Sequence, residues 1–110
     1  MDNLNSIFHC LSDPTRRAVI AQLATGPAPV SELAAPYDMA LPSFLKHIKI
    51  LESGGWIETE KSGRVRTCRL RPDAMRAAES WLDRQRTVWE TRLDQLDALL
   101  SNMNDEEDMK

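Results

Sequence analysis

The segment 41–70 constrains the fold of this chain more than any other part of the sequence. Apolar residues recur at helical spacing over 41–53, and two consecutive glycines then end the pattern. Two stretches of strand-like alternation follow, over 56–60 and 65–70, and the turn between them contains Gly63. The segment therefore predicts a helix followed by a β-hairpin.

The residues before this segment predict three shorter helices. Apolar residues from Leu4 onward follow the spacing of an amphipathic helix, and Asp13 is a favourable N-cap for a second helix over 14–24. Ser31 is expected to cap a third helix over 32–37. Four helices followed by a hairpin predict a mainly α fold of the winged helix-turn-helix type.

The residues after the hairpin predict one long final helix, from Pro72 to about Leu100. Its apolar residues follow the a/d seam of a coiled coil. The main seam residues are Leu82, Trp89, Leu93 and Leu96. Residues 101–110 are acidic and lack periodicity, so we expect one domain over 1–100 and a disordered tail after it.

The charge of the chain is distributed unevenly along its length. The net charge is −3, yet the segment 41–71 holds seven cations against three anions, a balance of +4. The segment 81–110 holds four cations against eight anions. The positive charge of a basic DNA-binding segment over 41–71 is thus offset by an acidic dimerisation helix over 81–110. The net charge therefore does not exclude a nucleic-acid partner.

The sequence predicts a cytoplasmic protein without a membrane partner. No apolar run approaches the roughly 20 residues that cross a bilayer. The N-terminus also lacks a basic flank followed by an apolar core, which a secretion signal would have.

The predicted helix 41–53 and hairpin carry the candidate DNA contacts. In a helix-turn-helix the first turn of the second helix faces base edges in the major groove, and cations beside a tight turn reach the backbone or the minor groove. The candidates on the helix are Pro42, Ser43, Lys46, His47 and Lys49, and those in the hairpin are Lys61, Arg64 and Arg66.

Several of these residues also have an ordinary structural explanation. Lys49 is equally well explained as a solvated surface lysine, and His47 as a half-buried ring with hydrogen-bond partners. Arg69 and Arg71 lie far from the hairpin tip and are expected to pair with acids such as Glu58. The gathering of the other cations on one side of a single fold favours DNA binding.

Several short motifs stand in a fixed order along the chain. They are Asp13-Pro14-Thr15-Arg16-Arg17, Val30-Ser31-Glu32-Leu33-Ala34, Leu41-Pro42-Ser43 with Lys46-His47-Ile48 and Leu51-Glu52, and Gly55-Trp56-Ile57 with Gly63-Arg64. In these motifs the chain resembles the ArsR family of bacterial winged-helix repressors, over residues 4–100. The resemblance implies a homodimer that binds a pseudo-palindromic operator in double-stranded DNA and blocks promoter access. It also implies a dimer interface formed by the first and last helices, which adds Leu4 and Phe8 to the seam residues.

The chain departs from the family pattern at positions that matter for its ligands. Ala40 stands where a capping serine is common, and Leu45 stands where a serine that faces DNA is common. Leu45 suits a thymine methyl group, so base preference does not transfer from relatives.

The metal-binding motifs of the family's sensors are absent. Glu32-Leu33 is followed by alanines rather than thiols, and the last helix has no histidine. We therefore expect no metal and no cofactor. A thiol switch at Cys10 or Cys68 remains an alternative, and it requires an exposed thiol with a lowered pKa. The identity of any small-molecule effector stays open.

Two classes of function compete. The favoured one is a dimeric repressor, and the alternative is a winged-helix protein-interaction module that docks a partner through the long final helix. An enzyme is not expected, because the sequence has no Gly-rich phosphate loop, paired-carboxylate signature or activated nucleophile. Salt separates the two classes, since a protein that neutralises several DNA phosphates loses affinity steeply as salt increases.

Overall fold

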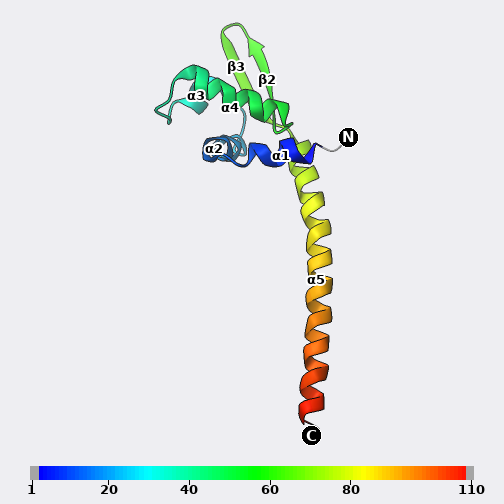
Figure 1. The fold of residues 1–110 in the computed structure, drawn as a ribbon. Coiled ribbons are helices and arrows are strands. Elements are labelled where there is room, and N and C mark those ends of the chain that lie inside the picture. Colours follow the sequence, from blue (N-terminus) through cyan, green and yellow to red (C-terminus); the bar gives the residue numbers. More distant parts are fainter. Residues whose placement is uncertain (1–2, 109–110) are drawn as a thin grey trace. The chain divides into compact units, whose positions relative to one another are not determined.

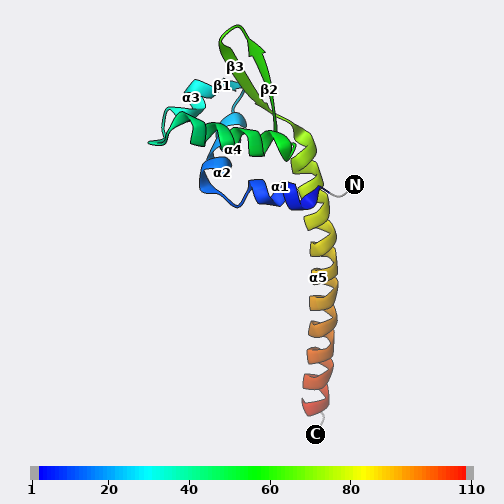
Figure 2. The same cartoon turned by 45° about the horizontal axis from the view of Figure 1, so that its top comes forward.

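The computed structural model describes residues 3–108 of the 110-residue chain. Its contacts group into two compact units, one that ends at Ala78 and one that begins at Glu79. The elements in chain order are α1 (Leu4–Cys10), α2 (Pro14–Leu23), β1 (Ala28–Pro29), α3 (Val30–Ala34), α4 (Leu41–Ser53), β2 (Ile57–Ser62), β3 (Val65–Leu70) and α5 (Pro72–Asp108). The predicted winged helix-turn-helix order of helices and hairpin is confirmed (Figure 1). The strand β1, labelled in Figure 2, is an addition.

Asp13 and Pro14 determine where α2 begins. The Asp13 backbone is extended, and its carboxylate accepts a hydrogen bond from the amide of Arg16 at 3.1 Å. Pro14 occupies the first helical turn, where its missing N–H has no partner to lose. Both features confirm the predicted start of this helix.

The helix α3 begins and ends before its predicted range of 32–37. Its N-cap is Pro29 rather than the predicted Ser31, and no side chain caps it. The earlier start places Val30 on the buried face of the helix. Pro36 has no N–H to donate, which prevents the helix from continuing to the predicted end.

The helix α4 is the second helix of the helix-turn-helix. Its buried residues Phe44, Ile48 and Leu51 repeat at spacings of four and three, so one face packs on the core. Ala40 stands at the N-cap and contributes no side-chain hydrogen bond. In both views α4 lies between α2 and the hairpin, and it packs against both (Figures 1 and 2). The opposite face of α4 remains open to solvent.

The three strands form one antiparallel sheet in the order β1-β3-β2. The strands β2 and β3 form the predicted hairpin, called the wing below, in which Ser62 pairs with Val65. Gly63 adopts a positive φ of 62°, which glycine tolerates without strain. The strand β1 was not predicted, because two residues show no alternation and Pro29 suits only an edge strand.

A single hydrophobic core joins the helices of the first unit to the sheet. Its most deeply buried residues include Leu33, Phe44, Leu51 and Trp56. The indole N–H of Trp56 donates to the carbonyl oxygen of Ile7 at 2.9 Å in this core. This buried hydrogen bond ties the base of the wing to α1 and so fixes where the wing begins.

The helix α5 continues to Asp108, beyond its predicted end near Leu100. The predicted helix end near Leu100 is therefore wrong, the domain boundary at 100 with a disordered tail after it stays a prediction, and residues 109–110 of that tail lie outside the described residues. The apolar spacing extends past Leu100 to Met103, so the helical pattern does not stop where the acidic residues begin.

Candidate nucleic-acid interface

The solvent face of α4 carries the polar and cationic residues that the sequence singles out. Pro42, Ser43, Lys46 and Lys49 are all exposed. Among the residues that the structure describes, neither lysine forms an ion pair with a carboxylate. Both ammonium groups are therefore available to a phosphate or a base edge.

The wing brings three further cations together at its tip. Lys61 on β2 pairs in register with Arg66 on β3, and Arg64 follows Gly63 in the connecting turn. All three side chains are exposed, and within residues 3–104 none of them forms an ion pair. The structure thus groups the predicted wing contacts in one place.

The two arginines nearer the base of the wing form ion pairs with carboxylates. Arg69 lies 3.9 Å from Glu58 and 3.6 Å from Glu60, measured between guanidinium nitrogen and carboxylate oxygen. Arg71 lies 3.0 Å from the carboxylate of Asp73. The prediction that these arginines pair with acids is confirmed, and it separates them from the cations at the wing tip.

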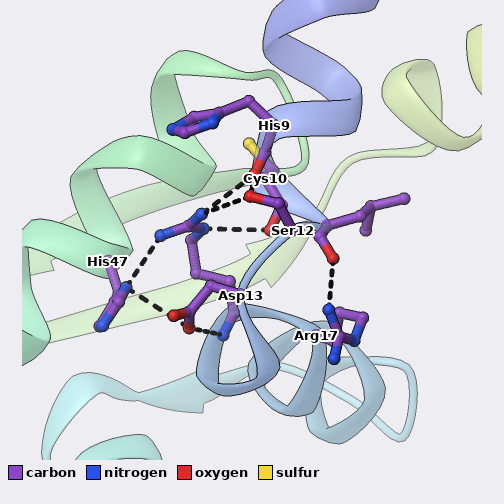
Figure 3. A network of polar contacts seen from close by, with 8 residues as sticks. His9, Cys10, Ser12, Asp13, Arg17 and His47 are labelled. Carbon is purple, nitrogen blue, oxygen red and sulfur yellow. Dashed lines mark hydrogen bonds and ion pairs between the residues drawn. The ribbon is translucent and has the colours of Figure 1, made fainter.

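His47 lies in a polar network rather than in open solvent (Figure 3). Its side chain is 21% exposed, and its Nδ1 atom lies 3.1 Å from Nη1 of Arg16 and 3.8 Å from the carboxylate of Asp13. An arginine can only donate, so a hydrogen bond between the two side chains requires a neutral ring that accepts at Nδ1 and carries its proton on Nε2. The half-buried interpretation of His47 is therefore confirmed, and its DNA contact stays a prediction.

Arg16 is a buried residue whose contacts hold three helices together, a role that the sequence pattern alone did not indicate. Its side chain is only 5% exposed, and it donates to the backbone carbonyls of His9 and Cys10, each at 3.0 Å. These carbonyls belong to the last turn of α1, where helix acceptors lack partners and favour a cation. Arg16 thus joins the end of α1, the start of α2 and the side of α4. Its place in the Asp13–Arg17 motif was the available signal.

The carboxylate of Asp13 stays ionised in this network. Partial burial raises its pKa, but the amide hydrogen bond from Arg16 and the nearby positive charge outweigh that effect. The net result holds the pKa of Asp13 below its ordinary value. The N-cap of α2 therefore keeps its full acceptor strength at neutral pH.

The two cysteines are buried inside the first unit. The Cys10 thiol donates weakly to the carbonyl of Ile50 at 3.4 Å, and Cys68 is fully buried on β3. Burial raises the pKa of both thiols above the ordinary value. A sensor thiol needs the opposite environment, so the geometry disfavours the thiol switch considered from the sequence.

A shallow cleft of about 320 Å³ separates the start of α4 from the wing. Leu41 and Val65, which line it, are 54% and 51% exposed, and Leu45 is half-buried between them. Arg64 and Arg66 also line it. Apolar groups flanked by cations match a DNA strand, whose sugars and thymine methyls lie between phosphates. The sequence pattern indicated Leu45 as a candidate DNA contact, but it gave no such signal for Leu41 and Val65.

The second unit is a helix with an exposed apolar seam. Leu82, Trp89, Leu93 and Leu96 all lie on α5, and between 49% and 67% of each is exposed. A row of large apolar side chains at a/d spacing is typical of a helix that pairs with another helix. In the first unit, the other two predicted interface residues, Leu4 and Phe8, are half-buried.

The described residues hold no group of three histidine, cysteine, aspartate or glutamate side chains that fits a metal ion. In the same part of the chain, no helix is both long and apolar enough to cross a bilayer.

Comparisons with known proteins find the same architecture. A family model described as a helix-turn-helix domain matches residues 11–60. The HTH-type transcriptional regulator Rv2034 of Mycobacterium tuberculosis (strain ATCC 25618 / H37Rv) is 34% identical over 77 residues, which cover 70% of this chain and 72% of that protein. The transcriptional repressor SdpR of Bacillus subtilis (strain 168) is 25% identical over 79 residues, which cover 72% of this chain and 88% of that protein.

Solved structures extend this similarity to most of the chain. The crystal structure of the ArsR family transcriptional regulator RHA00566 is 59% identical in sequence, with a TM-score of 0.78. The match covers 80% of this chain and 91% of that protein's chain.

Proposed function

This chain belongs to the ArsR family of winged helix-turn-helix DNA-binding transcriptional regulators, and from that membership we propose that it is a homodimeric repressor that grips duplex DNA with α4 and the wing of each copy. The proposed contacts are Pro42, Ser43, Lys46, His47 and Lys49 on α4, with Lys61, Arg64 and Arg66 on the wing. The transcription it controls places the protein in the cytoplasm.

One observation carries the proposal: the exposed cations of α4 and of the wing tip have no carboxylate partners among the described residues, whereas Arg69 and Arg71 do. Lysines and arginines that served only solubility could form ion pairs with nearby carboxylates, as Arg69 and Arg71 do. Cations held ready at the end of a wing and along an exposed helix suit a row of phosphates.

Within this group, His47 has a defined role. Arg16 occupies Nδ1, so the ring offers one donor, Nε2–H, and no acceptor. A single donor suits a phosphate oxygen or a base acceptor. Arg16 and Asp13 hold the ring in place, and through the ring they help to fix the position of α4 relative to α2.

Dimerisation follows from the apolar seam of α5. Trp89 and Leu93 are 67% and 53% exposed, which is costly in water for side chains of this size. Pairing with the seam of a second copy removes this surface from water. A two-fold dimer presents two reading heads, so the operator is a pseudo-palindrome, and a dimer bound there blocks the promoter.

The test is binding of the full chain to a duplex from the region upstream of its own gene, measured by fluorescence anisotropy, with a shuffled duplex as control. If three of the five proposed cations in each copy neutralise phosphates, the affinity falls about a thousandfold between about 50 and 200 mM salt. The own-gene duplex should bind more tightly than the shuffled one. Absence of binding to both at low salt would overturn the proposal in favour of a protein-interaction module.

A further inference from the structure

An open groove of about 590 Å³ lies between α1 and α4, on a side of the reading helix that the proposed DNA contacts only partly cover. Its α1 side is formed by Asn5, Ser6 and His9. Its α4 side is formed by Lys46, Lys49, Ile50, Ser53 and Gly54. This volume is within the range of small-molecule sites in proteins.

The bottom of the groove is apolar and closely packed. Gly54 is buried, and a Cβ atom at this position would collide with the Cys10 sulfur and crowd the Ser6 carbonyl. The end of α4 therefore approaches α1 as closely as the backbone allows, at one of the residues that line the groove. Ile50 and the aliphatic stems of the lysines supply the walls. Such a floor favours the apolar body of a ligand.

The rim of the groove is cationic. Lys46 and Lys49 stand one helical turn apart on the same wall, and His9 faces them from α1, where its exposed ring appears on the α4 side in Figure 3. No carboxylate lines the groove, and within residues 3–104 neither lysine has an ion-pair partner. An apolar floor beneath two unneutralised ammonium groups complements an anion attached to an apolar body.

We infer that this groove binds a small hydrophobic monocarboxylate, whose apolar body lies against Ile50 and Gly54 and whose carboxylate meets Lys46 and Lys49. Because Lys46 and Lys49 are both proposed DNA contacts as well, the bound acid competes with the operator and acts as an inducer. The binding step is independent of DNA, and only the competition step rests on the proposed function.

The binding step is tested on the ¹⁵N-labelled full chain without DNA, by titration with 2-naphthoate and with its uncharged counterpart 2-naphthamide. We expect saturable amide shifts confined to α1 and α4, with clearly weaker binding of the amide. Lys49→Gln should weaken naphthoate binding about tenfold, as expected for loss of one charge-assisted hydrogen bond. Lys61→Gln removes the same charge from the wing and should leave binding unchanged.

Three results would overturn the binding step. These are equal affinity for the acid and the amide, equal effects of the two lysine substitutions, and shifts that fall outside α1 and α4. A fourth result would also count against the proposal. If only a monomeric variant such as Trp89→Asp bound naphthoate, the second copy of the chain would be covering the groove in the dimer, and the ligand proposal would fall.

The competition step is tested by repeating the DNA titration with naphthoate at saturation. A loss of DNA affinity is expected with naphthoate, and a clearly smaller loss with 2-naphthamide at the same concentration. Unchanged DNA affinity with the groove occupied would refute the inducer role. If the chain does not bind DNA at all while naphthoate still binds in the groove, the proposed function fails and the ligand site stands.

Discussion

The Nη1 atom of Arg16 lies 3.1 Å from Nδ1 of His47, and this contact joins the start of α2 to the side of the reading helix α4. The two residues are 31 positions apart in the chain. The same guanidinium holds the carbonyls of His9 and Cys10 at the end of α1. One buried arginine thus sets the position of three helices around the proposed DNA-binding surface.

The ring of His47 should carry its proton on Nε2 in the folded protein. Arg16 has no acceptor to offer, so the neutral ring must accept at Nδ1. Long-range ¹H–¹⁵N correlation spectra of the imidazole at neutral pH distinguish the two neutral tautomers directly. A proton found on Nδ1 would mean that the contact with Arg16 does not exist in solution.

Arg16→Gln should lower the free energy of unfolding by about 2–4 kcal/mol, because it leaves buried carbonyls of α1 without a donor. The measurement is urea unfolding at one fixed protein concentration, since dimerisation couples to stability. Arg17→Gln is the matched control. Arg17 is exposed and makes a single bond to the carbonyl of Leu11, so its loss should cost less than about 1 kcal/mol. Similar losses for the two variants would contradict the role given to Arg16.

Local patterns were sufficient wherever neighbours in the sequence determine the structure. Asp13 and Pro14 start α2 by contacts within one helical turn, and Gly63 makes the tight turn of the wing by its own backbone freedom. The exposed lysines of α4 followed from the spacing of the buried residues Phe44 and Ile48.

Features that depend on distant partners were not predictable from the sequence. The strand β1 exists because Ala28 pairs with Cys68, forty positions away. Two residues are too few to show the alternation of apolar and polar residues that would predict a strand. The contact between Arg16 and His47 is of the same kind. The predicted end of α5 near Leu100 was wrong for another reason. The acidic composition after Leu100 suggested that the helix stops there, but the apolar spacing continues to Met103.

The thiols of Cys10 and Cys68 should react slowly with Ellman's reagent in the folded protein. Both are buried, and burial raises the pKa of each, so at neutral pH the reactive thiolate is scarce and shielded. Reaction should become fast only when the protein is unfolded in denaturant. Rapid labelling of either thiol under native conditions would restore the redox-switch hypothesis.

Trp89→Asp should convert the dimer to a monomer, because a carboxylate placed in the apolar seam costs several kcal/mol when it is buried without a partner. Sedimentation velocity over a range of protein concentrations gives the answer. Thr91→Asp is the matched control, since it adds the same charge to the same helix at an exposed position outside the a/d spacing. A Trp89→Asp variant that sediments as a dimer would remove the α5 seam from the interface.

The most direct test of DNA binding by α4 and the wing is the salt dependence of operator affinity for Lys46→Gln and Arg64→Gln, compared with Arg92→Gln. The first two residues are exposed cations in the proposed interface, and Arg92 is an exposed cation on α5. Each interface substitution removes two phosphate contacts per dimer, so the slope of log affinity against log salt should become shallower by about two. Arg92→Gln should leave the slope at the wild-type value. Equal slopes for all three variants and the wild type would show that α4 and the wing do not hold the DNA.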